Sequence, residues 1–117
     1  ITRLSAARRD LRLGLSASPT DAVAWTRLAD TEARLGHPAR AAAALTLACE
    51  IAPNDPRPAA MQFDLALILW PHLDGRAKTA IEGRLRWAER RSNMKSVVAG
   101  TAAVALRNRL VSERSGP

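Results

Sequence analysis

The chain has 117 residues, of which 47% are hydrophobic, and it carries a formal net charge of +7 at pH 7. That length is enough for one hydrophobic core and does not require a second domain. Aromatic residues make up only 3%, and alanine is abundant, so few strands are expected. The single cysteine excludes an intrachain disulfide. We therefore expect one small all-α domain.

Apolar periodicity and helix breakers divide the chain into six segments. Asp21 is a suitable N-cap, Gly36 supplies the left-handed residue that ends a helix, and Pro38 starts the next one. Pro53 and Pro56 then stop that helix. The expected helices cover residues 3–15, 22–35, 38–52, 58–70, 75–91 and 93–111.

The fourth and the last segments carry further signals. The fourth is apolar nearly all round, with only Gln62 and Asp64 polar, which predicts a central helix covered on several sides. The last begins at a break where Ser92 or Asn93 could cap it. It is expected to end near Val111 and to lead into a polar tail.

An internal repeat links the first half of the chain to itself with a period of 34 residues. The residues that recur are Ala7, Leu11, Gly14, Pro19 and Asp21, matched by Ala41, Leu45, Ala48, Pro53 and Asp55. Residues 22–55 also carry, in order, Trp25, Leu28, Ala29, Gly36, Ala41, Leu45, Ala48 and Pro53. With these residues the chain resembles a tetratricopeptide repeat (TPR) protein.

The resemblance implies helical hairpins stacked as a short right-handed α-solenoid of about six helices, with Trp25 packed between paired helices. Glu32 and Pro38 depart from the pattern, because the family usually has an aromatic or apolar residue there. The expected organisation is a half repeat or capping helix at 1–21, a full repeat at 22–55, a degenerate repeat at 56–91 and a capping helix with a tail at 92–117.

The family binds other proteins and has no catalytic activity of its own. The resemblance therefore implies an adaptor, scaffold or assembly factor that takes up a peptide or helix in a concave groove. The groove positions correspond to Val23, Thr26, Asp30, Ala33 and Arg34. Asp30 and Arg34 also suit a solvated i, i+4 ion pair. Units that grip an acidic C-terminal peptide usually present Lys and Asn here, and this sequence does not, so that ligand class is not expected.

The basic charge lies mostly outside the full repeat. Residues 1–12 contribute +3 and residues 76–95 contribute +5, whereas residues 21–56 contribute −2. A candidate basic patch consists of Arg84, Arg86, Arg90 and Arg91. It suits an acidic protein surface or an anionic membrane surface, or it is simply a solvated face. Nucleic acid is unlikely as a partner, because the basic segments lack interleaved exposed aromatics.

Catalytic and metal-binding patterns are not evident. His37 and His72 fall in turns and are not spaced as metal ligands, and Cys49 lies on an apolar helix face that suits a buried thiol. Ser92 and Lys95 match an S-x-x-K motif, but the other elements of that enzyme class are absent. We expect no enzyme activity, no metal and no cofactor.

The compartment depends on what precedes Ile1, because a chain that begins without Met is expected to be part of a longer one. An anchor there would make it a bacterial membrane-associated or periplasmic protein, and otherwise it would be cytoplasmic. An alternative function is a structural or regulatory subunit packed permanently in a larger complex, with its basic flanks on acidic protein, anionic membrane or nucleic acid. The oligomeric state is left open.

Overall fold

A computed structural model of the chain describes residues 2–115, and every regular element in that part is helical, as the composition predicts. The α-helices are α1 (Thr2–Ala17), α2 (Ala22–Arg34), α3 (Pro38–Ile51), α4 (Ala59–Ile68), α5 (Gly75–Glu89), α6 (Lys95–Val98) and α7 (Thr101–Ser115). Two 3-10 turns, η1 (Trp70–His72) and η2 (Ser92–Met94), connect some of them. In this described range, no helix combines the length and the apolar character that a bilayer span requires.

The ends of the early helices follow the local signals in the sequence. The Asp21 carboxylate accepts a hydrogen bond from the Ala24 amide at 3.0 Å and so caps α2. Gly36 has φ of 80°, a left-handed value that costs glycine little, and it follows the end of α2. Pro38 begins α3, and α3 ends at Ile51, before the two prolines. These predictions are confirmed.

The C-terminal region differs from the single helix expected over 93–111. The chain instead forms η2 and the four-residue α6, and then starts α7 after Gly100. Neither Ser92 nor Asn93 supplies a side-chain cap to this region. A Cβ at position 100 would lie 3.1 Å from the Val97 carbonyl oxygen, so the bend favours glycine. α7 then continues to Ser115, through most of the expected tail, whose last residues 116–117 lie outside the described residues.

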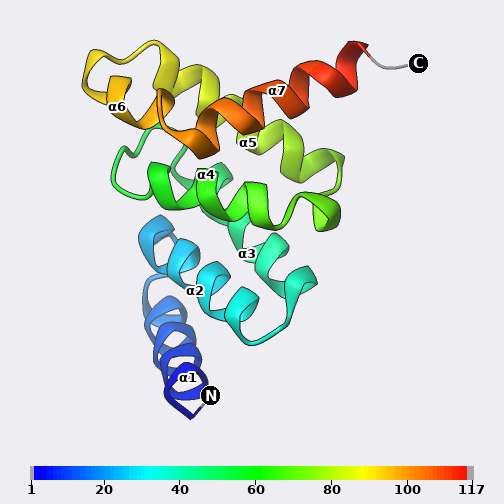
Figure 1. Cartoon of the computed structure of the whole chain (residues 1–117). Helices are drawn as coiled ribbons and strands as arrows, with labels where there is room; N and C mark the ends of the chain where they lie inside the picture. Colours follow the sequence, from blue (N-terminus) through cyan, green and yellow to red (C-terminus); the bar gives the residue numbers. More distant parts are fainter. Residues whose placement is uncertain (1, 116–117) are drawn as a thin grey trace.

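Helices pack on one another along a slightly elongated body of 41 × 32 × 22 Å, with α1 at one end and α7 at the other (Figure 1). α2 and α3 form a closely packed hairpin, α1 packs on α2, α3 packs on α5, and α4 packs on α7. Ala29, Ala41 and Ala48 are fully buried in this arrangement. Their small side chains allow the helix backbones to approach closely, which explains why alanine occupies these repeated positions.

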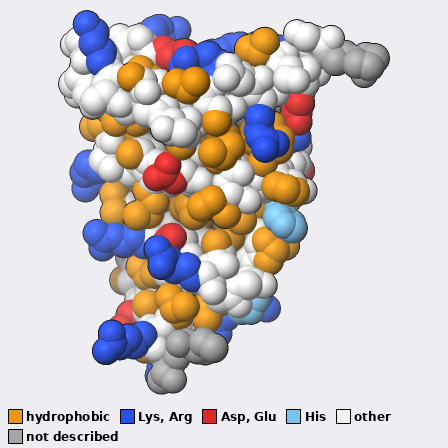
Figure 2. Space-filling model, viewed as in Figure 1, with side chains coloured by type: hydrophobic (Ala, Val, Ile, Leu, Met, Phe, Trp, Pro, Cys, Tyr) orange, Lys and Arg blue, Asp and Glu red, His pale blue; other side chains and the backbone are white. Residues whose placement is uncertain are grey.

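α4 lies near the middle of the body and contacts α2, α3, α5 and α7, as its apolar sequence predicts. Leu65 and Leu69 are buried, but Met61 is 42% exposed and Ile68 is 69% exposed. One side of α4 is therefore left uncovered, and Figure 2 shows hydrophobic side chains gathered over this helix.

Candidate functional site

The five positions expected to line a concave groove do not form one open site. Thr26 is only 1% exposed. Its hydroxyl donates to the Ala22 carbonyl at 2.8 Å and accepts from the Gln62 amide at 3.1 Å, so Thr26 joins α2 to α4 and is not available to a partner. Its assignment as a groove residue is therefore wrong.

The remaining four groove positions stay at the surface of α2. Asp30 and Arg34 pair with each other at 3.0 Å, as an exposed i, i+4 pair. Val23 and Ala33 are half-buried. An exposed pair of this kind adds little to stability, and its two charges largely satisfy one another. This side of α2 offers few unpaired polar groups for recognition.

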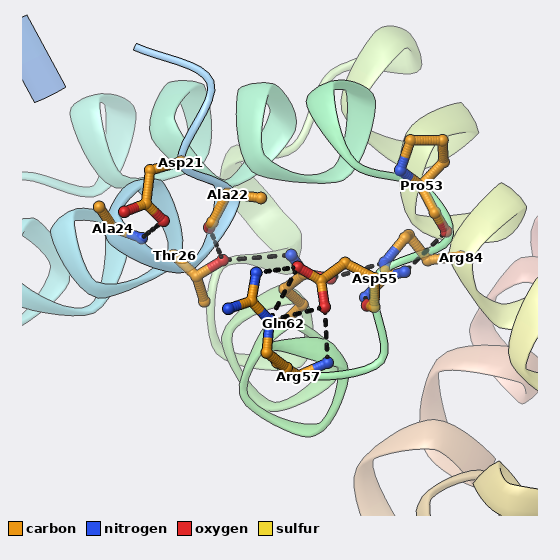
Figure 3. Close-up of polar contacts among 9 residues, drawn as sticks. All are labelled: Asp21, Ala22, Ala24, Thr26, Pro53, Asp55, Arg57, Gln62 and Arg84. Atoms are coloured by element: carbon orange, nitrogen blue, oxygen red, sulfur yellow. Dashed lines mark hydrogen bonds and ion pairs between the residues drawn. The ribbon is translucent and has the colours of Figure 1, made fainter. Parts of the chain in front are cut away.

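Arg84 is the second correction, because it is 1% exposed and cannot belong to a solvated basic patch. Its three donor nitrogens reach three oxygens: Nε donates to Gln62 Oε1, Nη1 to the Pro53 carbonyl and Nη2 to the Asp55 carbonyl, each at 2.7 Å (Figure 3). Burial lowers the pKa of Arg84, but arginine begins so far above neutrality that the guanidinium stays charged. The side chain ties α5 to α4 and to the loop between α3 and α4.

The other members of the predicted patch are exposed on and just after α5. Arg86 pairs with Glu82 at 3.2 Å, and the Arg91 guanidinium lies 5.7 Å from the centre of the Trp87 ring. Arg90 ends α5 as its C-cap residue. The patch is thus reduced to three arginines, and the first of them already has an acidic partner.

The candidate site is an apolar hollow of about 490 Å³ between α1, α2 and α3, which we name the α1–α3 groove. Its apolar lining comes from all three helices: Leu15, Trp25, Leu28, Ala43, Ala44 and Leu47. Arg12, Ser16, Glu32 and Arg40 supply its polar lining. The groove thus combines apolar walls with a charged edge, the composition typical of sites that bind a ligand by one face.

Trp25 forms a fixed wall of this groove. Its indole Nε1 donates to the Pro19 carbonyl at 2.8 Å, which holds the ring in one orientation. The side chain is only half-buried, so it packs on the core with one part and lines the groove with another. The expectation of a ring enclosed between paired helices therefore holds only in part.

Glu32 fixes the position of α1, the other wall of the groove. It is 2% exposed, and its carboxylate lies 3.6 Å from Arg8, 3.3 Å from Arg12 and 3.0 Å from His37. Burial by itself raises the pKa of Glu32, but the hydrogen bond with His37 and the charges of Arg8 and Arg12 outweigh it and lower the pKa below its ordinary value. Glu32, at a position where the tetratricopeptide pattern usually has an aromatic or apolar residue, thus attaches α1 to α2 through polar contacts.

This attachment predicts that α1 loosens in acid. Because the pKa of Glu32 is lower in the folded state than in the unfolded state, its stabilising contribution is complete above the unfolded value and is lost as the pH falls through the folded one. The measured hydrogen-exchange rates of the α1 amides are first corrected for the intrinsic pH dependence of amide exchange. As the pH falls from the unfolded-state pKa of Glu32 through the folded-state pKa, the corrected exchange should become faster. Glu32→Gln should remove most of this pH dependence. Equal acid sensitivity in both proteins would show that other carboxylates control α1.

Reactive groups are few in the described part of the chain. Cys49 is buried, and this burial raises the pKa of its thiol to about 12, far from that of a reactive thiolate. No group of three or more His, Cys, Asp or Glu side chains within residues 2–115 is placed to hold a metal ion.

The sequence pattern missed the α1–α3 groove, although one signal for it was present. The third helix carries apolar residues on more than one face. Leu45 and Ala48 are buried in the core, whereas Leu47, two residues after Leu45, points to a different side of the helix. An apolar residue outside the core stripe indicates a second contact surface.

Comparison with family models, curated proteins and solved structures finds no match for this chain.

Proposed function

We propose that the chain is a protein–protein interaction module of the tetratricopeptide type, which binds a short segment of a partner protein in the α1–α3 groove. The proposal includes stacking of the helical hairpins as a short right-handed α-solenoid. Its support is the period of 34 residues, which separates the end of α1 at Ala17 from the end of α3 at Ile51. An adaptor, scaffold or assembly factor needs such a surface and no catalytic group.

The observation that carries the proposal is the apolar lining of the groove. Leu15 and Leu28 form buried parts of it, and Trp25 and Leu47 remain half-buried beside a hollow that no side chain of the described residues fills. An exposed apolar hollow of this size is a common mark of a site for partner side chains, because covering it removes apolar surface from water. A helix or extended segment that inserts two or three apolar side chains fits this description.

A groove-filling substitution tests the proposal. Ala43 is exposed on α3 and lines the groove, so Ala43→Trp should occupy the hollow with little effect on folding. A library of short random peptides displayed on phage is selected on the wild-type chain, and enriched peptides are measured on both proteins by fluorescence polarisation. We expect Ala43→Trp to weaken their binding at least about tenfold, which corresponds to the loss of one buried apolar side chain.

Asn108→Trp is the matched control, because Asn108 is exposed on α7, which does not border the groove. It adds the same side chain elsewhere and should leave peptide affinity unchanged. Melting curves of both variants verify that the fold persists. Selection that yields no peptide sensitive to Ala43→Trp would exclude the groove as a binding site.

A second candidate function is a structural subunit whose helices pack permanently in a larger complex. It is favoured by exposed apolar side chains on two helices: Met61 and Ile68, seven residues apart on α4, form an apolar face, and Val104 and Val111 are also exposed on α7. A permanent subunit with such a face should self-associate or unfold when it is isolated. Sedimentation equilibrium distinguishes the two functions, because an interaction module should remain a folded monomer.

A further inference from the structure

The α1–α3 groove continues at both ends into smaller hollows. At one end it shares Arg12 and Ser16 with a hollow of about 420 Å³ on the surface of α1. At the other end it shares Ala43 and Leu47 with a hollow of about 220 Å³ between α3 and the start of α5. The three hollows are therefore neighbours, with the shared side chains on the rims between them, and we name this row of hollows across α1, α3 and α5 the trough.

The chemistry of the trough changes from one end to the other. The hollow on α1 is lined by Arg8, Arg9 and Arg12. The middle is mostly apolar, with Glu32 and Arg40 in its polar lining, and the far end holds Asp74 and Arg76. Both residues at the far end are already engaged: Asp74 caps α5 by accepting from the Ala77 amide at 2.8 Å, and Arg76 donates to Glu50, also at 2.8 Å from its Nε. Unsatisfied charge is therefore concentrated at the α1 end.

The charge at the α1 end is positive after its ion pairs are counted. Glu32 faces both Arg8 and Arg12, so one carboxylate meets two guanidinium groups. Within residues 2–115, neither Arg9 nor Arg40 lies within ion-pair distance of a carboxylate. A ligand with carboxylates at this end gains attraction, whereas a second copy of this chain brings a formal net charge of +7.

We propose that the trough binds an acidic and apolar segment of a partner protein in one direction, with carboxylates at the α1 end. Apolar side chains of the segment occupy the groove and the hollow beyond it, on either side of Leu47. This inference rests on the proposed function, to which it adds the chemistry and the orientation of the ligand. Its site is separate from the α2 positions at which an acidic C-terminal peptide is not expected.

Charge reversal of Arg9, which lines the α1 hollow, and of Arg40, which lines the adjoining groove, tests this inference on peptides enriched from the random library. In the double variant Arg9→Glu with Arg40→Glu, the affinity for these peptides should fall about tenfold at low salt, with a smaller loss at high salt. The control Arg27→Glu with Lys95→Glu changes the net charge equally, at exposed residues that neither line the trough nor belong to the basic patch. It should retain more than half of the wild-type affinity at the same salt.

Orientation is measured with a nitroxide attached to the acidic end of an enriched peptide. We expect it to broaden the amide resonances of α1 and to leave those at the start of α5 sharp. The opposite pattern, or broadening at both ends, would overturn the single direction.

The library separates this inference from the function on which it rests. Peptides that bind through the groove but carry no acidic residues would overturn the inference and leave the proposed function intact. Peptides whose affinity is insensitive to Ala43→Trp would remove both. Enrichment of acidic and apolar peptides that lose affinity in both the Ala43 variant and the double arginine variant supports both.

Discussion

Arg84→Ala is expected to lower the free energy of unfolding by about 3–5 kcal/mol, because three acceptors lose their donors and each unsatisfied buried acceptor costs roughly 1–3 kcal/mol. The guanidinium donates to Gln62 and to the carbonyls of Pro53 and Asp55. Without it, three buried or partly buried oxygens lose their donors in a region that water enters poorly. Urea unfolding followed by circular dichroism measures the change.

Two further substitutions decide whether the network is the cause. Arg86→Ala removes the same side chain two residues along α5, where it is exposed, and it should alter the free energy of unfolding by less than about 0.5 kcal/mol. Arg84→Lys keeps the charge but presents a single donor group, so its stability should fall between that of the wild type and that of Arg84→Ala. Equal stability of Arg84→Ala and Arg86→Ala would mean that the buried hydrogen bonds contribute nothing.

Leu45→Ala is expected to cost about 3 kcal/mol, within the usual range for truncating a buried leucine. Leu45 is 1% exposed on α3, between α2 and the helices that follow, and it belongs to the repeated residue set. Its removal leaves a cavity that closely packed helices cannot fill by collapse. A lower urea midpoint at an unchanged slope would show that stability alone has changed.

Leu13→Ala makes the same chemical change at a side chain that is 65% exposed on α1. Since little apolar area is lost there, it should shift the free energy of unfolding by less than about 0.5 kcal/mol. Equal effects of the two leucine substitutions would contradict the placement of Leu45 in the core.

Local signals in the sequence predict most helix boundaries well, because each depends on a few neighbouring residues. The Asp21 carboxylate caps a helix with an amide three residues away, and Gly36 adopts a backbone conformation that other residues rarely take. The prediction of one long helix after Ser92 is wrong for the opposite reason. The bend at Gly100 places α7 against α4 and α5, and no local residue pattern specifies that contact.

The location of the candidate site was the feature that the sequence predicted least well. Repeat positions placed the groove on the exposed face of α2, but Thr26 is used there to join α2 to α4. The α1–α3 groove depends on how far α1 stands from α3, and that spacing follows from the attachment of α1 to Glu32. An acidic residue at an expected apolar position gave no indication of which cations would surround it.

The all-α class, the early helix ends and the alanines at close helix contacts follow from the amino-acid sequence, because propensity, capping and periodicity act over a few residues. Which charged side chains are buried depends instead on how the helices pack. Arg84 and Arg86 look alike in the sequence, yet one is enclosed by Gln62 and two backbone carbonyls while the other remains in solvent. Desolvation and hydrogen bonding depend on groups far away along the chain, so only packing distinguishes a buried arginine from an exposed one.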